Sequence, residues 1–188
     1  MHRFESGRRL TFMSILQNYY TLIETLTRKR WLWVLLSVLI LLLNALVFPL
    51  FTSGETRSLP DTRFYYTSGT LTQYLYTMNR DQKTTFIIFH TTVDILYPVT
   101  YTLFLSFLLF AAGGTYRKLI VPLPLSIFIF DILENSGMVL PLSLLRSGTF
   151  MARADLQVTP FFTTAKWICT GITAGIVCIT AVRHFLHK

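Results

Sequence analysis

Charged side chains are scarce in this sequence, and acidic ones are the scarcest. Of 188 residues only 14% are charged, and 9 Asp and Glu residues stand against 17 Lys and Arg residues. Hydrophobic residues make up 52% of the chain, and the mean hydropathy is +0.51. These values lie outside the range of soluble globular domains. The composition therefore excludes a soluble domain and indicates an integral membrane protein.

Cysteine is also nearly absent, which excludes a disulfide framework. Cys169 and Cys178 are nine residues apart in one apolar segment, or about 13–14 Å along a helix. That distance is too long for a disulfide bond between them. No spacing of cysteine and histidine matches a zinc site.

The net charge of +8 comes from short basic stretches that flank apolar segments. This distribution is typical of membrane orientation signals and argues against nucleic-acid binding. The first apolar segment follows 30 residues and has no A-x-A-like cleavage site, so we interpret it as a retained anchor and not as a signal peptide. Both Met1 and Met13 remain candidate translation starts.

Four long apolar segments predict four transmembrane helices. The first is free of charged residues and can cross about 30 Å of hydrocarbon at about 1.5 Å per residue. The expected spans are residues 31–51, 86–112, 119–145 and 161–182. The sequence thus predicts an all-α fold, a polytopic four-helix membrane bundle, with residues 1–30 as a cytoplasmic N-terminal segment and residues 31–188 as one membrane domain.

Basic residues predict the orientation of these spans. They cluster at Arg28–Arg30, at Arg117–Lys118 and at Arg183–Lys188, which four spans place on the same side of the membrane. Lys and Arg near membrane spans are retained on the cytoplasmic side. We therefore expect a multi-pass protein of the bacterial cytoplasmic membrane with both termini in the cytoplasm.

The first external loop, residues 52–85, is long enough to contain structure of its own. Apolar residues recur in it at spacings of three and four, at Leu71, Tyr74, Leu75 and Met78. This pattern predicts a short amphipathic helix with Ser68 as its N-cap. Such a helix serves either as interfacial packing or as a lid over a site.

Ionisable residues recur inside the second, third and fourth spans. His90 and Asp94 are four residues apart on one helix face, which Tyr97 and Tyr101 continue. In the third span one face carries Asp131, Glu134 and Asn135, and the fourth span begins with Lys166 and Trp167 near its outer end. Asn44 is a polar residue within the first span.

Counting residues along antiparallel helices places these side chains at overlapping depths, with Asp94 and Asp131 deeper than His90, Glu134 and Lys166. Ionisable groups inside a membrane are expensive and are candidates for function. We expect one outward-facing pocket, with catalytic candidates His90, Asp94, Asp131, Glu134 and Lys166 and binding candidates Asn44, Tyr97, Tyr101, Asn135 and Trp167.

Several functions fit such a pocket. Carboxyl groups in a dry site serve acid–base chemistry on a lipid-like molecule, or the binding of one. Alternatively Asp94, Asp131, Glu134 and His90 are candidate ligands for a divalent metal ion. The cluster also suits a proton- or cation-coupled transport component, a structural ion network, or a non-catalytic membrane assembly partner.

Membrane lipids are the expected partners of such a chain. Gly171 and Gly175 form a G-x-x-x-G pattern in the fourth span, which is typical of close helix approach. We expect this approach within one chain, with a homodimer seam as the alternative.

Three stretches, DILYPVTYTLFL, FDILENSGM and FFTTAKW, carry a family resemblance. With them the chain resembles a group of small bacterial four-helix membrane proteins over roughly residues 60–167. The group shares a D-x-x-Y-P element, a D-x-x-E-N element and a Lys-Trp pair, and it has no assigned activity. The resemblance implies one site, without His90, that contains Asp94, Tyr97, Pro98, Asp131, Glu134, Asn135 and Lys166. In architecture alone, the bundle is also similar to the emopamil-binding and sterol-isomerase group.

Overall fold

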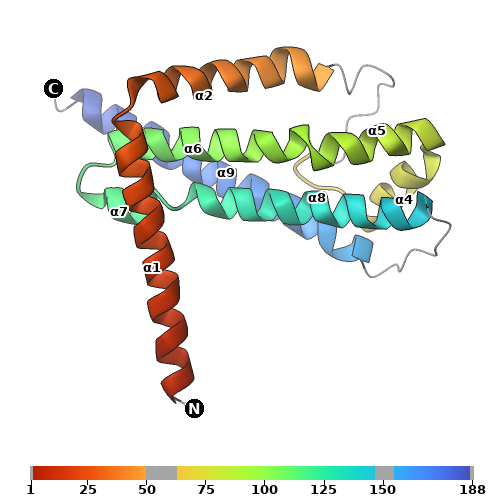
Figure 1. Cartoon of the computed structure of the whole chain (residues 1–188), viewed down its shortest axis with the longest axis horizontal. Helices are drawn as coiled ribbons and strands as arrows, with labels where there is room; N and C mark the ends of the chain where they lie inside the picture. Colours follow the sequence, from red (N-terminus) through yellow and green to blue (C-terminus); the bar gives the residue numbers. More distant parts are fainter. Residues whose placement is uncertain (1, 50–62, 147–154, 187–188) are drawn as a thin grey trace.

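The protein is all-α in the computed structural model, which describes residues 2–49, 63–146 and 155–186 (Figure 1). No strand occurs within these ranges, which confirms the expected fold class. The helices are α1 (His2–Thr27), α2 (Arg30–Leu42), the π-helix η1 (Leu43–Val47), α4 (Ser68–Thr77), α5 (Arg80–Thr91), α6 (Val93–Ala112), the 3₁₀ turn η3 (Gly114–Tyr116), α7 (Arg117–Ile120), α8 (Pro124–Arg146) and α9 (Asp155–Leu186).

Four helical segments of the described chain are long and apolar enough to cross a membrane. They cover residues 30–47, 80–112, 114–144 and 156–183, and they support a multi-pass integral membrane protein. The second segment begins at Arg80 and the fourth helix at Asp155, each six residues before the expected start of its span. Residues 50–51 of the expected first span lie outside the described residues.

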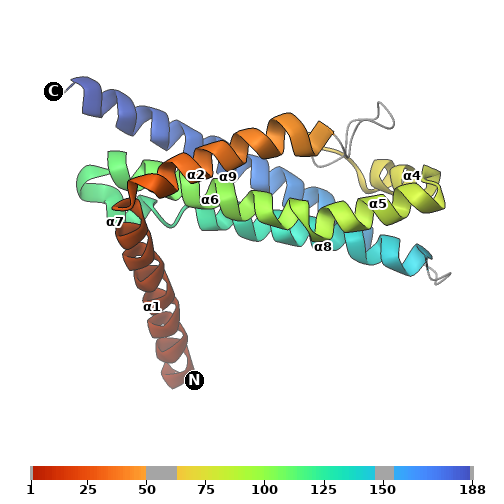
Figure 2. The ribbon, with the colours of Figure 1, turned by 45° about the horizontal axis from the view of Figure 1, so that its top comes forward.

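The long helices pack along one another as a bundle. Helix α8 packs against α9, and both contact α6, while α2 runs along α6 (Figures 1 and 2). The short helix α4 lies at one end of the bundle, and α7 lies at the other with the C-terminus and the α1–α2 junction. We refer to these as the α4 end and the α7 end.

A hydrophobic core fills each end of the bundle. At the α4 end it consists of Tyr66, Leu71, Leu75, Phe86, Met138, Leu142 and Leu156. At the α7 end it consists of Tyr20, Ile23, Leu36, Phe107, Leu109, Ile120 and Val121. The polar residues singled out from the sequence lie between these two cores.

Helix α4 confirms the short helix expected in the first external loop. Leu71 and Leu75 are fully buried in the core at the α4 end. The expected N-cap, Ser68, is wrong by one residue. Thr67 has the extended backbone of a cap, and its hydroxyl accepts the N–H of Thr70 at 3.2 Å, whereas Ser68 is already helical.

Residues 2–27 form α1, a helix that the sequence reading did not anticipate. It runs crosswise to the bundle at the α7 end (Figures 1 and 2). One of its faces is buried, at Tyr20 and Ile23. The Tyr19 hydroxyl lies 2.7 Å from Ser106 Oγ, which itself donates to the carbonyl of Val121 at 3.2 Å. Because Ser106 gives its single hydroxyl proton to Val121, the Tyr19 hydroxyl donates to Ser106. Burial raises the pKa of Tyr19.

The two glycines of the G-x-x-x-G pattern do not pack against another helix within the described part of the chain, so the expected packing there is wrong. A Cβ placed at Gly171 or Gly175 meets nothing within 4 Å. Packing inside the bundle is therefore not their role, and the homodimer seam stays a prediction.

Gly137 is the glycine that brings two helices together. A Cβ at this position of α8 would lie 2.4 Å from Thr159 Oγ1 and 3.2 Å from Thr159 Cβ, on α9. Thr159 is itself buried, so it has little room to move. A side chain at position 137 would push α8 and α9 apart.

We predict that Gly137→Ala destabilises the protein by about 1–3 kcal/mol through overpacking. Gly171→Ala and Gly175→Ala are the matched controls, because open space surrounds both positions. Thermal unfolding of the purified variants in detergent should show a lower Tm for Gly137→Ala alone. Equal Tm values for the three variants would contradict the close approach at Gly137.

Candidate functional site

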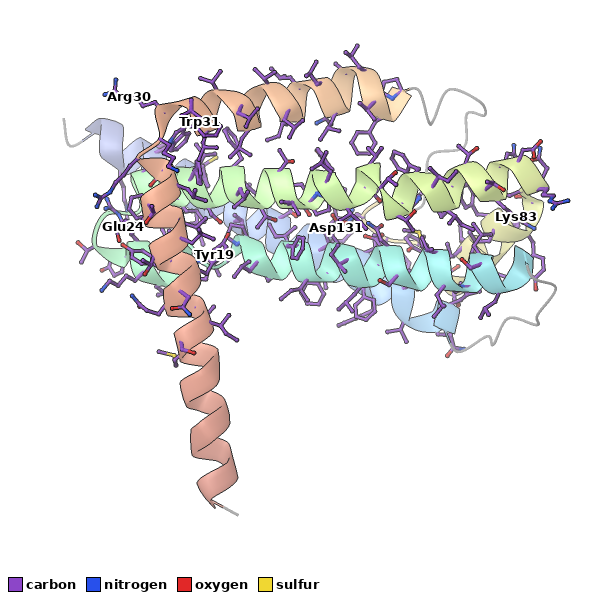
Figure 3. All side chains as sticks on the ribbon, viewed as in Figure 1. Tyr19, Glu24, Arg30, Trp31, Lys83 and Asp131 are labelled. Carbon is purple, nitrogen blue, oxygen red and sulfur yellow. The ribbon has the colours of Figure 1, made fainter. Side chains whose placement is uncertain are left out.

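A lysine and two carboxylates meet in the middle of the bundle. Lys166 Nζ, on α9, donates to Asp131 Oδ1 at 2.8 Å and also contacts Glu134 Oε2, both on α8. Figure 3 shows Asp131 between the two hydrophobic ends. The side chain of Glu134 is fully buried, while those of Asp131 and Lys166 are 7% and 13% exposed. We call these three residues the ion triad.

Hydroxyl groups satisfy the remaining carboxylate oxygens of the triad. Tyr101 on α6 donates to Asp131 Oδ2 at 2.9 Å. Thr163 on α9 donates to Glu134 Oε1, and its Oγ1 lies 2.9 Å from the hydroxyl of Tyr66. The triad thus connects α6, α8, α9 and the segment that precedes α4.

His90 and Asp94 form a second pair beside the triad. His90 is buried and stacks on Phe86 with ring centroids 3.8 Å apart. Its Nδ1 donates to the carbonyl of Phe86 at 2.9 Å, and its Nε2 lies 3.7 Å from Asp94 Oδ2. The carbonyl acceptor on Nδ1 fixes which imidazole nitrogen faces the carboxylate.

A helix break separates His90 from Asp94. Thr92 leaves the helical region with φ −123° and ψ −79°, so α5 ends and α6 begins at this point. The hydroxyls of Thr91 and Thr92 donate back to the carbonyls of Ile87 and Ile88, at 2.7 Å and 2.6 Å. Hydroxyl groups bonded to the preceding turn in this way bend helices.

Asn135 joins α8 to the start of α6. Its Nδ2 donates to the main-chain carbonyl of Asp94 at 3.1 Å. Its expected role as a ligand-binding residue stays a prediction. Pro98 has no N–H to give to the residue four positions before it, so it leaves that carbonyl without its helical partner. Asn135 supplies the missing donor from α8 and thereby holds the pair and the triad together.

Three of the binding candidates lie at the edge of the site. Asn44 Nδ2 donates to the carbonyl of Ile40 at 2.8 Å and lies 3.3 Å from the Tyr97 hydroxyl. The Tyr97 ring meets that of Tyr101 edge-on at 5.3 Å. Trp167 is 36% exposed, and its ring centre is 6.0 Å from Lys166 Nζ, so it lines the outer surface.

Thr163 and Tyr66 are site residues that sequence reasoning missed. Thr163 precedes Lys166 by three residues, so the two share a helix face, and this spacing was a usable signal. Tyr66 precedes α4 and contacts Thr163 across 97 positions of sequence. Nothing in its local sequence indicates that contact.

The longer helices also change the depth of the site. Lys166 lies eleven residues after the start of α9, about 16 Å along the helix, and not one or two turns from its end. His90 lies ten residues after the start of α5, or about 15 Å. Each residue therefore lies about a third of the way along its long helical segment, residues 155–186 for Lys166 and residues 80–112 for His90.

The geometry gives the metal hypothesis no support. Within the described residues, no three His, Cys, Asp or Glu side chains are grouped so that they could hold a metal ion. The Lys166 ammonium takes the place between Asp131 and Glu134 that a cation would need. His90 and Asp94 face each other across the break between α5 and α6, on other helices than the triad.

We predict that Pro98 and Asn135 are energetically coupled. Asn135→Leu leaves the Asp94 carbonyl without a donor and should cost about 1–3 kcal/mol. In a Pro98→Ala background residue 98 has an N–H for that carbonyl, so the same change should cost less. A double-mutant cycle on thermal stability measures the difference. Additive effects would show that Asn135 does not compensate for Pro98.

Comparisons with known proteins leave the site without a precedent. No protein-family model matches this chain, no curated protein matches it, and no solved structure matches it. The function has to be inferred from the residues of the site and their surroundings.

Proposed function

We propose that this protein binds and modifies a lipid-like molecule by acid–base chemistry at the ion triad. The observation behind the proposal is a lysine ammonium held between two buried carboxylates in the apolar middle of the bundle. Ionisable residues are rare at such depth unless they serve a function.

In this proposal the ion triad binds and releases one proton. With all three groups ionised it carries one net negative charge, which a low-dielectric interior disfavours. The neutral form holds one additional proton on a carboxyl group. That proton can pass to a substrate, and a carboxylate can take one back, so the cycle requires no co-reactant.

Two hydroxyl groups orient the carboxyl groups of the triad, and the exposed surface of each triad residue indicates which one a substrate would contact first. Tyr101 and Thr163 hold the two carboxyl groups in fixed orientations. Of the three groups, Asp131 and Lys166 have exposed surface and Glu134 has none. A lipid-like molecule would therefore meet Asp131 and Lys166 first, with Glu134 as the internal proton reservoir.

We also propose that the protein spans a bacterial cytoplasmic membrane with both termini in the cytoplasm. The basic clusters Arg28–Arg30 and Arg117–Lys118, together with Arg183, support this orientation because they gather at the α7 end. The α4 end would then face outward. The outward-facing pocket that we expect from the sequence stays a prediction.

We predict that Asp131→Asn, Glu134→Gln and Lys166→Met each reduce the lipid conversion by about 10²–10⁴-fold, since each removes a proton donor, a proton acceptor or the shared cation. Mass spectrometry of total lipid extracts from cells that produce each variant is the measurement. Glu24→Gln is the control, because Glu24 pairs with Arg28 at the surface.

Protein amount and thermal stability separate chemistry from folding. Asp131→Asn keeps an acceptor for Lys166 and should stay folded, whereas Lys166→Met leaves two buried carboxyl groups unpaired and should lose about 3–5 kcal/mol. Misfolding of all three variants, or an unchanged lipid profile in folded Asp131→Asn, would contradict the proposed function and favour a structural network.

A second candidate function is a proton-coupled transport component. Buried hydroxyl side chains continue from the triad toward the α7 end, at Thr102, Ser106 and Thr173. Ser106 is about 6 Å beyond Thr102 along α6.

Proteoliposomes with an internal pH-sensitive dye separate the two candidates. For the lipid function we predict no proton flux above that of empty liposomes. A flux that disappears in Asp131→Asn and falls in Ser106→Ala would select the transport function instead.

A further inference from the structure

Helix α1 has an orientation that suits a membrane surface. It runs crosswise to the long helices of the bundle, and it lies at the α7 end (Figures 1 and 2). A helix perpendicular to membrane-spanning helices lies parallel to the membrane plane. The bonds between Tyr19, Ser106 and Val121 fix it to the bundle in this orientation.

The side chains of α1 form three different faces. Tyr20 and Ile23 are buried against the bundle. Ile15 and Leu22, seven residues apart and therefore on one side, are 56% and 49% exposed. Exposed polar residues, Gln17, Thr21 and Thr25, occupy another side. An apolar flank beside a polar flank is typical of a helix at a lipid–water interface.

Positive charge gathers around the same end. Arg28, Lys29, Arg30, Lys118 and Arg183 are exposed there. Among the side chains that the structure describes near the α1–α2 junction, the acidic one is Glu24, which lies 3.5 Å from Arg28. Figure 3 shows Glu24, Arg30 and Trp31 together at this end, with Lys83 at the other.

Exposed aromatic residues accompany the charges. Trp31 is 61% exposed and Tyr116 is 67% exposed. Each is adjacent in sequence to an arginine. Tryptophan and tyrosine concentrate at the level of lipid headgroups. The α7 end thus combines an apolar flank, aromatic residues and a nearly uncompensated positive charge.

We propose that α1 lies in the membrane interface and that the α7 end binds anionic phospholipid headgroups. Ile15 and Leu22 enter the boundary of the acyl chains, while Lys118, Arg183 and the basic residues at the α1–α2 junction attract the headgroups. An anionic lipid fits better than a protein partner. The exposed apolar side chains of a helix parallel to the membrane can contact the bilayer itself, so no second protein is required to cover them. This proposal is independent of the chemistry at the ion triad.

Fluorescent probes on single cysteines test the position of α1. In the full chain with Cys169→Ala and Cys178→Ala, a polarity-sensitive dye is attached at Ile15→Cys, Leu22→Cys, Gln17→Cys or Thr21→Cys. In phosphatidylcholine nanodiscs, a nitroxide on the lipid chains should quench the dyes at positions 15 and 22 several-fold more strongly than those at 17 and 21. Equal quenching at all four positions would overturn the interfacial placement.

A second arm tests the charge of the lipid. Nitroxide-labelled phosphatidylglycerol should quench the dye at position 22 more strongly than labelled phosphatidylcholine at the same fraction. Lys118→Gln with Arg183→Gln should reduce this preference at least by half, and high salt should weaken it. Arg80→Gln with Lys83→Gln, at the α4 end, is the matched control and should change nothing. The anionic-lipid site would be overturned if both lipids quenched the dye at position 22 equally in the protein that keeps all its Lys and Arg residues.

Discussion

A buried positive charge needs compensating partners, and this requirement organises the middle of the protein. Lys166 finds two carboxylates, Asp131 and Glu134, which sit three residues apart on one face of α8. For the ammonium to reach both, α9 must present Lys166 to that face. The glycine at position 137 permits this, because it lets Thr159 of α9 approach the backbone of α8. Close packing and charge compensation therefore depend on each other.

The same principle governs the backbone next to the triad. Pro98 removes a helical hydrogen bond, and Asn135 restores one to the carbonyl of Asp94 from the neighbouring helix. The D-x-x-Y-P and D-x-x-E-N stretches are thus complementary halves of one contact. The break at Thr92 then turns His90 and Asp94 toward each other at the start of α6. Asn135 thus connects the His90–Asp94 pair to the helix that carries two members of the ion triad.

The two ends of the bundle differ in a way that gives the molecule a direction. At the α4 end, the short helix and its buried leucines close the bundle over the site. At the α7 end, a crosswise helix and a group of basic residues suit a charged membrane surface. The ion triad lies between them.

The sequence by itself determined the number of long apolar helices, because hydropathy and length are local properties of a segment. It also determined that His90 and Asp94, or Asp131 and Glu134, share a face, because the helical repeat fixes that within one helix. Local caps and helix starts were less certain, as Ser68 and the early start of α9 show.

Which faces meet was decided by the tertiary structure. How far each helix rotates about its axis depends on packing between segments distant in sequence, such as Thr159 against Gly137 or Thr163 against Tyr66. That rotation placed Lys166 between two carboxylates, turned Trp167 to the surface, gave the amide of Asn135 to a backbone carbonyl and left Gly171 facing open space. Periodicity along a single helix contains no information about its neighbours.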